Sequence, residues 1–98
     1  MRGDLRRALA LVRRRTHREP PRVVELLEKP DCGLCAEAYR ALRRVGLDVP
    51  VDITRVDITS RPDLFDRYAL RIPVIRSGER ELDVAGVDDR AIRAWLKE

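Results

Sequence analysis

Residues 22–46, RVVELLEKPDCGLCAEAYRALRRVG, carry the strongest secondary-structure signals in the chain. Arg22 to Glu28 form a short, mainly apolar run after two prolines, and such a run is typical of a strand buried on both faces. Apolar residues then recur at helical spacing, and a glycine follows where helices commonly end: Leu34, Ala38, Leu42, Val45 and Gly46. The pattern predicts a strand over 22–28 and a helix over 33–45.

A second strand is expected after this helix. Two sets of alternating apolar residues follow it: Val49, Val51 and Ile53, then Val56 and Ile58. The alternation shifts by one position at Thr54-Arg55, so this strand either bulges there or covers only part of the stretch. We expect pairing from Val51 to Ile58.

The remaining segments predict two helices and a hairpin. Ser60 as N-cap and Pro62 as first residue indicate a helix to about Leu70. Residues 74–76 and 80–84 indicate two strands joined by a turn at Ser77-Gly78. Asp88 indicates the N-cap of a last helix. The residues expected to face the core from these two helices are Leu64, Phe65 and Tyr68 in the first and Ala91, Ile92, Trp95 and Leu96 in the second.

In chain order the elements are βαβ, then α, then ββα, preceded by a helix at the N-terminus. A βαβ unit needs a right-handed parallel crossover, and a hairpin adds an antiparallel pair. The sequence therefore predicts an α/β fold, a four-stranded mixed sheet with helices on both faces. We expect a basic N-terminal helical extension, residues 1–20, and one domain, residues 21–98.

The predicted extension is strongly basic. Residues 1–22 contain eight arginines against two acidic residues, whereas residues 23–98 carry 13 basic and 15 acidic residues. Apolar residues at positions 5, 8, 9 and 12 predict an amphipathic helix over 4–17. This helix either lies with its apolar stripe on the domain or serves as a basic arm for a partner. With one Trp, two Tyr and one Phe, the chain offers few rings on which bases could stack, which disfavours nucleic-acid binding.

Length and composition exclude several classes of protein. A chain of 98 residues has room for one core, and 44% hydrophobic residues argue against a disordered chain. Its longest apolar run, Ala8 to Val12, is far shorter than the roughly 20 residues that cross a membrane. No small-residue cleavage site of a secretory signal follows that run. We expect a cytoplasmic protein without membrane contact.

The two cysteines, Cys32 and Cys35, lie at the junction between the first strand and its helix. Side chains three residues apart at a helix start are within reach of a disulfide. A bond that closes so short a loop stabilises a fold little, which favours redox chemistry over a structural role. The helix N-terminus lowers the pKa of a thiol at Cys32, although the neighbouring Asp31 opposes this effect. We expect Cys32 to attack and the more shielded Cys35 to resolve the mixed disulfide.

The two cysteines could instead bind a metal or stay chemically inert. Structural zinc needs four ligands, and the chain has only these cysteines and His17, so a zinc site within one chain is disfavoured. An iron–sulfur cluster shared between subunits and a pair of buried, inert thiols stay open. A Cys-x-x-Cys motif beside a βαβ pattern favours redox chemistry.

The sequence resembles the thioredoxin superfamily, and more closely a bacterial glutaredoxin-like family of small single-domain proteins. The resemblance covers about residues 22–97. It rests on three segments: KPDCGLCAEA at 29–38, YALRIPVI at 68–75 and GVDD at 86–89. The residues between the cysteines, Gly33-Leu34, differ from the Pro-Tyr of common glutaredoxins and the Gly-Pro of thioredoxins, and the residue before Cys32 is Asp31 rather than a Trp.

The resemblance implies a substrate site around Cys32. It implies a cis Ile72–Pro73 peptide bond beside the cysteines, with the backbone N–H and C=O of Ile72 free to pair with a bound peptide or glutathione. By the same resemblance, four residues occupy the places that hold glutathione: Lys29, Gly86, Asp88 and Asp89. Gly33 allows a partner to approach closely, and Leu34 is included with the substrate-binding residues. Glu25 is either a proton acceptor beneath Cys35 or, the favoured alternative, a residue at a polar edge or paired with an arginine.

The expected function is that of a dithiol thiol–disulfide oxidoreductase that uses Cys32 and Cys35 and needs no metal or organic cofactor. Its partners would be a disulfide-bearing protein or glutathione, with electrons from glutathione, another small thiol or a reductase. The alternative is a non-enzymatic redox sensor or adaptor that uses the same pair as a switch and the basic helix as a partner-binding arm. A nucleic-acid binder acting through that arm alone is disfavoured.

Overall fold

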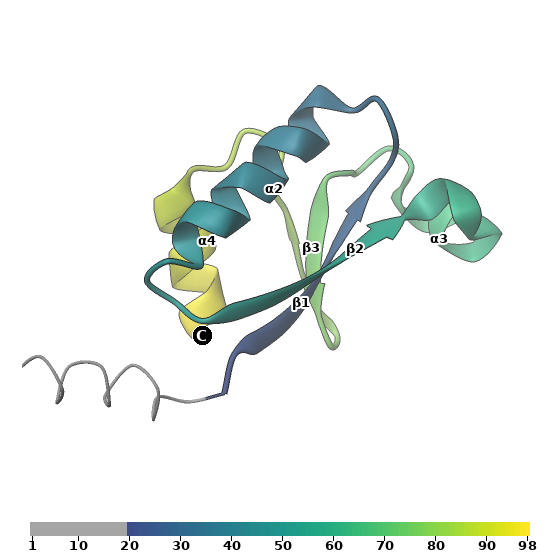
Figure 1. The fold of residues 1–98 in the computed structure, drawn as a ribbon. Coiled ribbons are helices and arrows are strands. Elements are labelled where there is room, and N and C mark those ends of the chain that lie inside the picture. The colour runs from purple at the N-terminus through teal and green to yellow at the C-terminus, as the bar shows by residue number, and fades with distance from the viewer. Residues whose placement is uncertain (1–19) are drawn as a thin grey trace, which may run out of the picture.

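The computed structural model describes residues 20–98 (Figure 1). The predicted helix over 4–17 lies outside these residues, and the division at residue 20 stays a prediction. The elements in chain order are β1 (Arg22–Glu28), α2 (Gly33–Val45), β2 (Val51–Asp57), the 3₁₀ turn η1 (Ile58–Ser60), α3 (Pro62–Tyr68), β3 (Val74–Ser77), β4 (Arg80–Asp83) and α4 (Asp89–Lys97). Within the described residues, the predicted order βαβ-α-ββα is confirmed.

The four strands form one mixed sheet in the order β2-β1-β3-β4. β1 and β2 are parallel, whereas β3 is antiparallel to both β1 and β4. α2 and α4 lie together on one side of this sheet and α3 lies on the other (Figure 1). The predicted α/β fold with helices on both faces is therefore correct.

Each face of the sheet has its own hydrophobic core. The larger core joins the strands to α2 and α4 through Val24, Leu26, Ala38, Ala41, Leu42, Val45, Ile75, Val84, Ile92, Trp95 and Leu96. The smaller one joins the strands to η1 and α3 through Leu27, Ile58, Leu64, Tyr68 and Val74. β1 is buried on both faces only toward its C-terminal end, because α3 is short and leaves Val23 exposed.

The two cores explain the change of alternation in β2. β1 and β2 pair one to one from Arg22↔Val51 to Glu28↔Asp57, so there is no bulge. Val51 and Ile53 pack on the larger core, whereas Val56 faces the smaller one. The parity changes because different helices cover the two ends of this strand. The strand ends at Asp57 and not at Ile58, which begins η1.

Other expectations at element ends were wrong. Ser60 does not cap α3: its hydroxyl donates to the carbonyl of Asp57, and Arg61 is the N-cap residue. That helix ends at Tyr68 instead of Leu70, and Phe65 is exposed. The hairpin pairs Ser77 with Arg80, which places the turn at Gly78 and Glu79, one residue later than expected.

Gly46 ends α2 as the sequence pattern indicates, whereas the apolar position expected for Leu34 was wrong. Gly46 is the C-cap residue, but its φ of −60° is right-handed. Glycine is favoured here by space, because a Cβ would lie 3.0 Å from Cγ1 of Val51 and 3.2 Å from the carbonyl of Leu42. At the other end, Leu34 is exposed and Cys35 takes the buried position in the first turn.

Candidate functional site

The two cysteines lie at the N-terminus of α2 and are joined by a disulfide. Cys32 is the N-cap residue in extended conformation, and its sulfur accepts a hydrogen bond from the backbone N–H of Cys35 at 3.2 Å. Cys35 is 1% exposed, whereas Cys32 is partly exposed. A partner can therefore reach Cys32 first, and the helix N-terminus stabilises negative charge on that sulfur after reduction.

The loop before Cys32 brings the chain from β1 into α2. Asp31 has a φ of +56°, in the left-handed region, which aspartate occupies more readily than most residues. Its side chain is exposed. The turn leaves Cys32 at the end of the loop with its sulfur at the surface of the domain.

A cavity of about 550 Å³ lies beside Cys32. Its lining includes two of the predicted site residues, Lys29 and Gly33, together with Cys32. Three charged residues that the sequence analysis missed also line it: Glu28, Arg55 and Asp57. The end of β1, the loop after it and the start of α2 thus line the cavity together with residues of β2.

Glu28 and Arg55 form a bidentate ion pair in this cavity. Arg55 Nε and Nη2 donate to the two carboxylate oxygens of Glu28 at 2.6 and 2.9 Å, and these hydrogen bonds raise the pKa of Arg55. Glu28 is 8% exposed. The guanidinium also lies 4.0 Å from the ring centre of Tyr39 on α2. The pair neutralises a buried carboxylate close to the cysteines, a charge that would otherwise disfavour a thiolate.

Two of the other predicted glutathione-binding residues, Gly86 and Asp89, line a different cavity. It has about 300 Å³, and its lining includes Leu34, Gly86 and Asp89 together with residues of α2. Asp88 is the N-cap of α4 and accepts a hydrogen bond from the N–H of Ala91 at 2.9 Å. Leu34 therefore groups with Gly86 and Asp89, and Lys29 and Gly33 group with Cys32.

Asp89 makes a pH-dependent contribution to stability. Arg44 donates to its two carboxylate oxygens at 2.8 and 3.1 Å, and these hydrogen bonds lower the pKa of Asp89 against the opposing effect of burial. A carboxylate whose pKa is lower in the folded chain stabilises the fold above its unfolded pKa of about 3.9, and the stabilisation is lost as the pH falls through the folded pKa.

We therefore expect Asp89→Asn to lower the free energy of unfolding at neutral pH. The difference in unfolding free energy between wild type and variant should shrink below about pH 4. It should vanish once Asp89 is protonated in both the folded and the unfolded chain. Denaturant titrations between pH 7 and acid would measure it. A difference that stays constant over this range would contradict the role of the ion pair.

The segment before β3 lies at the same end of the sheet as the cysteines. β3 pairs with β1 through Leu27↔Val74, which places Pro73 level with the end of β1, where the loop to Cys32 begins. The Ile72–Pro73 peptide bond is cis, and the carbonyl of Pro73 accepts a hydrogen bond from Val84 at 3.0 Å.

One expectation for this segment was wrong. The N–H of Ile72 is not free, because it donates to the carbonyl of Tyr68 at 3.1 Å. That carbonyl also accepts the N–H of Arg71 at 2.8 Å, so a turn forms between α3 and β3. A peptide that pairs with the N–H of Ile72 must compete with this bond.

Glu25 is not beneath Cys35. It lies on β1 between Val24 and Leu26, which face the larger core, and its own side chain points to the opposite face of the sheet. There Arg76 Nε donates to its carboxylate at 2.9 Å. The favoured alternative, an arginine partner, is confirmed.

Two further structural findings concern the described part of the chain only. Residues 20–98 contain no cluster of three or more His, Cys, Asp or Glu side chains arranged to hold a metal ion. Within the same range, no helix has both the length and the apolar character needed to span a membrane.

Comparison with known proteins identifies the family. The family model described as Glutaredoxin-like domain (DUF836) matches residues 23–97. The chain belongs to this glutaredoxin-like family. A search of curated proteins found no match.

Two solved structures are similar to this chain. The X-ray structure of the Northeast Structural Genomics target protein XcR50 from X. campestris is 35% identical, with a TM-score of 0.66, over 76% of this chain and 95% of that chain. The solution structure of XcR50 is 35% identical, with a TM-score of 0.64, over 76% of this chain and 91% of that chain. The domain is thus a glutaredoxin-like member of the thioredoxin superfamily, and its cysteine pair supports a thiol redox function.

Proposed function

We propose that this protein is a dithiol thiol–disulfide oxidoreductase. The observation that carries the proposal is the disulfide at the start of α2, in which a partly exposed sulfur, Cys32, is bonded to a buried one, Cys35. An accessible sulfur that a partner can reach, with a shielded second thiol held next to it, is what a two-step exchange requires.

In the first step of the proposed reaction, the Cys32 thiolate attacks one sulfur of a target disulfide. A bond forms between Cys32 and that sulfur, and the other target sulfur leaves as a thiolate that takes up a proton. In the second step Cys35, after losing its proton, attacks Cys32. The Cys32–Cys35 disulfide forms and the second target thiol is released. Two electrons pass from the dithiol to the target, and two molecules of a small thiol such as glutathione, or a reductase, restore the dithiol.

We propose that the cavity beside Cys32 receives the part of the substrate that carries the attacked sulfur. Lys29 and Gly33 line it next to Cys32, and Ile72 and Pro73 lie at the same end of the sheet. Only a longer substrate that extends toward α4 would contact the other predicted substrate-binding residues, which are Leu34, Gly86, Asp88 and Asp89. Asp88 and Asp89 already accept hydrogen bonds from Ala91 and Arg44, but a carboxylate can accept further bonds, so both glutathione and a disulfide-bearing protein belong to this proposal. Sulfur exchange alone needs no metal or organic cofactor, and a cytoplasmic location remains part of this proposal.

The proposal is tested by turnover. The purified protein should accelerate the reduction of insulin disulfides by dithiothreitol and of 2-hydroxyethyl disulfide by glutathione, at rates proportional to protein concentration. A protein whose cysteines cycle between dithiol and disulfide but which accelerates neither reduction would contradict the proposal. That result would favour the redox sensor or adaptor instead.

A further inference from the structure

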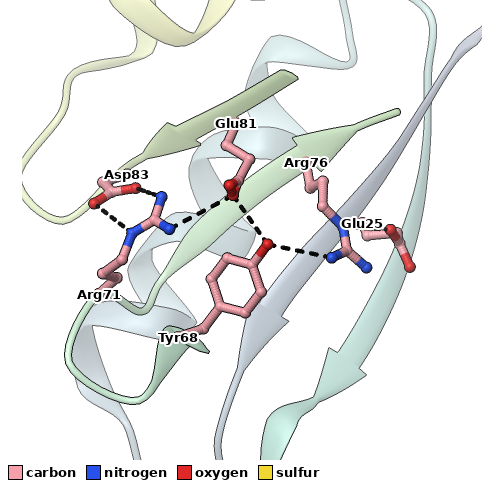
Figure 2. Close-up of polar contacts among 6 residues, drawn as sticks. All are labelled: Glu25, Tyr68, Arg71, Arg76, Glu81 and Asp83. Carbon is pink, nitrogen blue, oxygen red and sulfur yellow. Dashed lines mark hydrogen bonds and ion pairs between the residues drawn. The ribbon is translucent and has the colours of Figure 1, made fainter. Parts of the chain in front are cut away.

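A network of charged and polar side chains links the α3–β3 turn to the sheet (Figure 2). Arg71, two residues before Pro73, donates through Nη2 and Nε to Asp83 on β4 at 2.7 and 3.3 Å. Its Nη1 lies 3.6 Å from a carboxylate oxygen of Glu81 on the same strand. These contacts raise the pKa of Arg71, chiefly through the hydrogen bonds to Asp83, so Arg71 stays positively charged.

Tyr68 joins the same network from the other end of the turn. Its side chain is 1% exposed, and its hydroxyl donates to Glu81 at 2.9 Å while accepting from Arg76 at 3.3 Å. Arg76 in turn binds Glu25 on β1. Tyr68 is therefore tied to β4 directly and to β3 and β1 through Arg76, as Figure 2 shows.

The network holds the turn at both ends. Tyr68 ends α3, Arg71 comes three residues later, and the carbonyl of Tyr68 accepts the N–H groups of both Arg71 and Ile72. The side chains of Tyr68 and Arg71 meet at Glu81. We call Tyr68, Arg71, Glu81 and Asp83 the clamp. Its ion pairs cross from the turn to β4, so releasing them frees the turn without removing any contact in the larger core.

We propose that the clamp positions the Ile72–Pro73 segment beside Cys32 and thereby sets how tightly the protein binds a polypeptide that carries the target disulfide. This inference rests on the proposed oxidoreductase function. Its four members touch neither cysteine, so they are positioning residues. A polypeptide depends on the turn because its backbone has to pair with the carbonyl of Ile72, whose N–H is held by Tyr68, whereas a small disulfide needs only access to Cys32.

The experiment removes the guanidinium of Arg71. Arg71→Met keeps the length of the aliphatic stem, Arg71→Lys keeps the charge, and Tyr68→Phe removes only the hydroxyl. Arg61→Met is the matched control, because Arg61 forms an exposed ion pair with Asp63 at the start of α3, at the far end of that helix from the turn. Steady-state kinetics with insulin and with 2-hydroxyethyl disulfide, and hydrogen exchange at the amides of Arg71 and Ile72, are measured for each protein.

We expect Arg71→Met to raise KM for insulin about tenfold, with kcat and the KM for 2-hydroxyethyl disulfide within about twofold of wild type. Amide exchange at Ile72 should accelerate about tenfold, because opening of the turn becomes easier. Tyr68→Phe should also raise the KM for insulin and the exchange rate at Ile72, but by less than Arg71→Met does. Arg71→Lys should give values between those of Arg71→Met and wild type, and Arg61→Met should change neither value. The redox potential of the cysteine pair should be the same in all four variants.

Equal KM values for insulin in wild type and in every clamp variant, or equal exchange at Ile72, would overturn the inference. A parallel rise of KM for both substrates would also overturn it, since that result would mean general damage to the fold. If the wild-type protein reduces neither substrate, the oxidoreductase proposal fails by itself. Exchange at Ile72 then still decides whether the clamp holds the turn, since Arg71→Met must accelerate it and Arg61→Met must not.

Discussion

Replacing Cys32 with serine is expected to reduce turnover of a disulfide substrate to the uncatalysed rate. A hydroxyl at this position cannot attack a disulfide at neutral pH, and Cys35 is too buried to replace it. Cys35→Ser should act differently, because Cys32 can still attack but nothing displaces the product. This variant should accumulate a mixed disulfide at Cys32, which intact-protein mass spectrometry would detect as an adduct of the substrate's mass.

The double variant Cys32→Ser/Cys35→Ser is the control for this prediction and should form no adduct. Because Cys32 and Cys35 belong to neither of the two hydrophobic cores, circular dichroism should show a folded protein in each case. A Cys32→Ser protein that keeps full activity would contradict the assignment of the attacking sulfur. A Cys32→Ser protein that accumulates a mixed disulfide at Cys35 would reverse the two roles.

The largest effect on stability is expected from Leu26→Ala. Leu26 lies on β1 in the larger core and is 0% exposed, so its truncation leaves a cavity between the sheet and the helices. Such substitutions cost about 2–5 kcal/mol, a large part of the roughly 5–15 kcal/mol that stabilises a typical domain. Denaturant unfolding of the oxidised protein would measure the loss as a lower midpoint with an unchanged slope.

Val23→Ala on the same strand is the matched control. Val23 is 60% exposed, and substitutions at such surface positions usually change the free energy of unfolding by less than about 0.5 kcal/mol. Equal losses for Leu26→Ala and Val23→Ala would contradict the placement of the larger core.

Local sequence patterns were sufficient to predict most of the fold. The apolar run of β1, the helical spacing in α2 and the N-cap at Asp88 were correct because each depends on neighbours in the sequence. The position of the cysteines followed from β1 and α2 together. The errors at Ser60 and at the hairpin turn concern element ends, where one alternative hydrogen bond decides between neighbouring residues.

Features that depend on contacts between distant segments could not be predicted in this way. Glu28 and Arg55 are 27 residues apart and meet only because β1 and β2 pair in one particular register. The alternation in β2 was misleading because two helices cover its two faces at different ends. The bond from Ile72 to Tyr68 depends on the exact end of α3. An acidic residue at the end of a buried strand was the only sequence signal for Glu28.

The most direct test of the account is a titration of the reduced protein in glutathione buffers of increasing oxidation, followed by mass spectrometry after alkylation. We expect one two-electron transition from two alkylated thiols to an unalkylated Cys32–Cys35 disulfide, with any transient glutathione adduct confined to Cys32. Separate titration of the two thiols, stable adducts on both, or thiols that react only after the protein unfolds would contradict it.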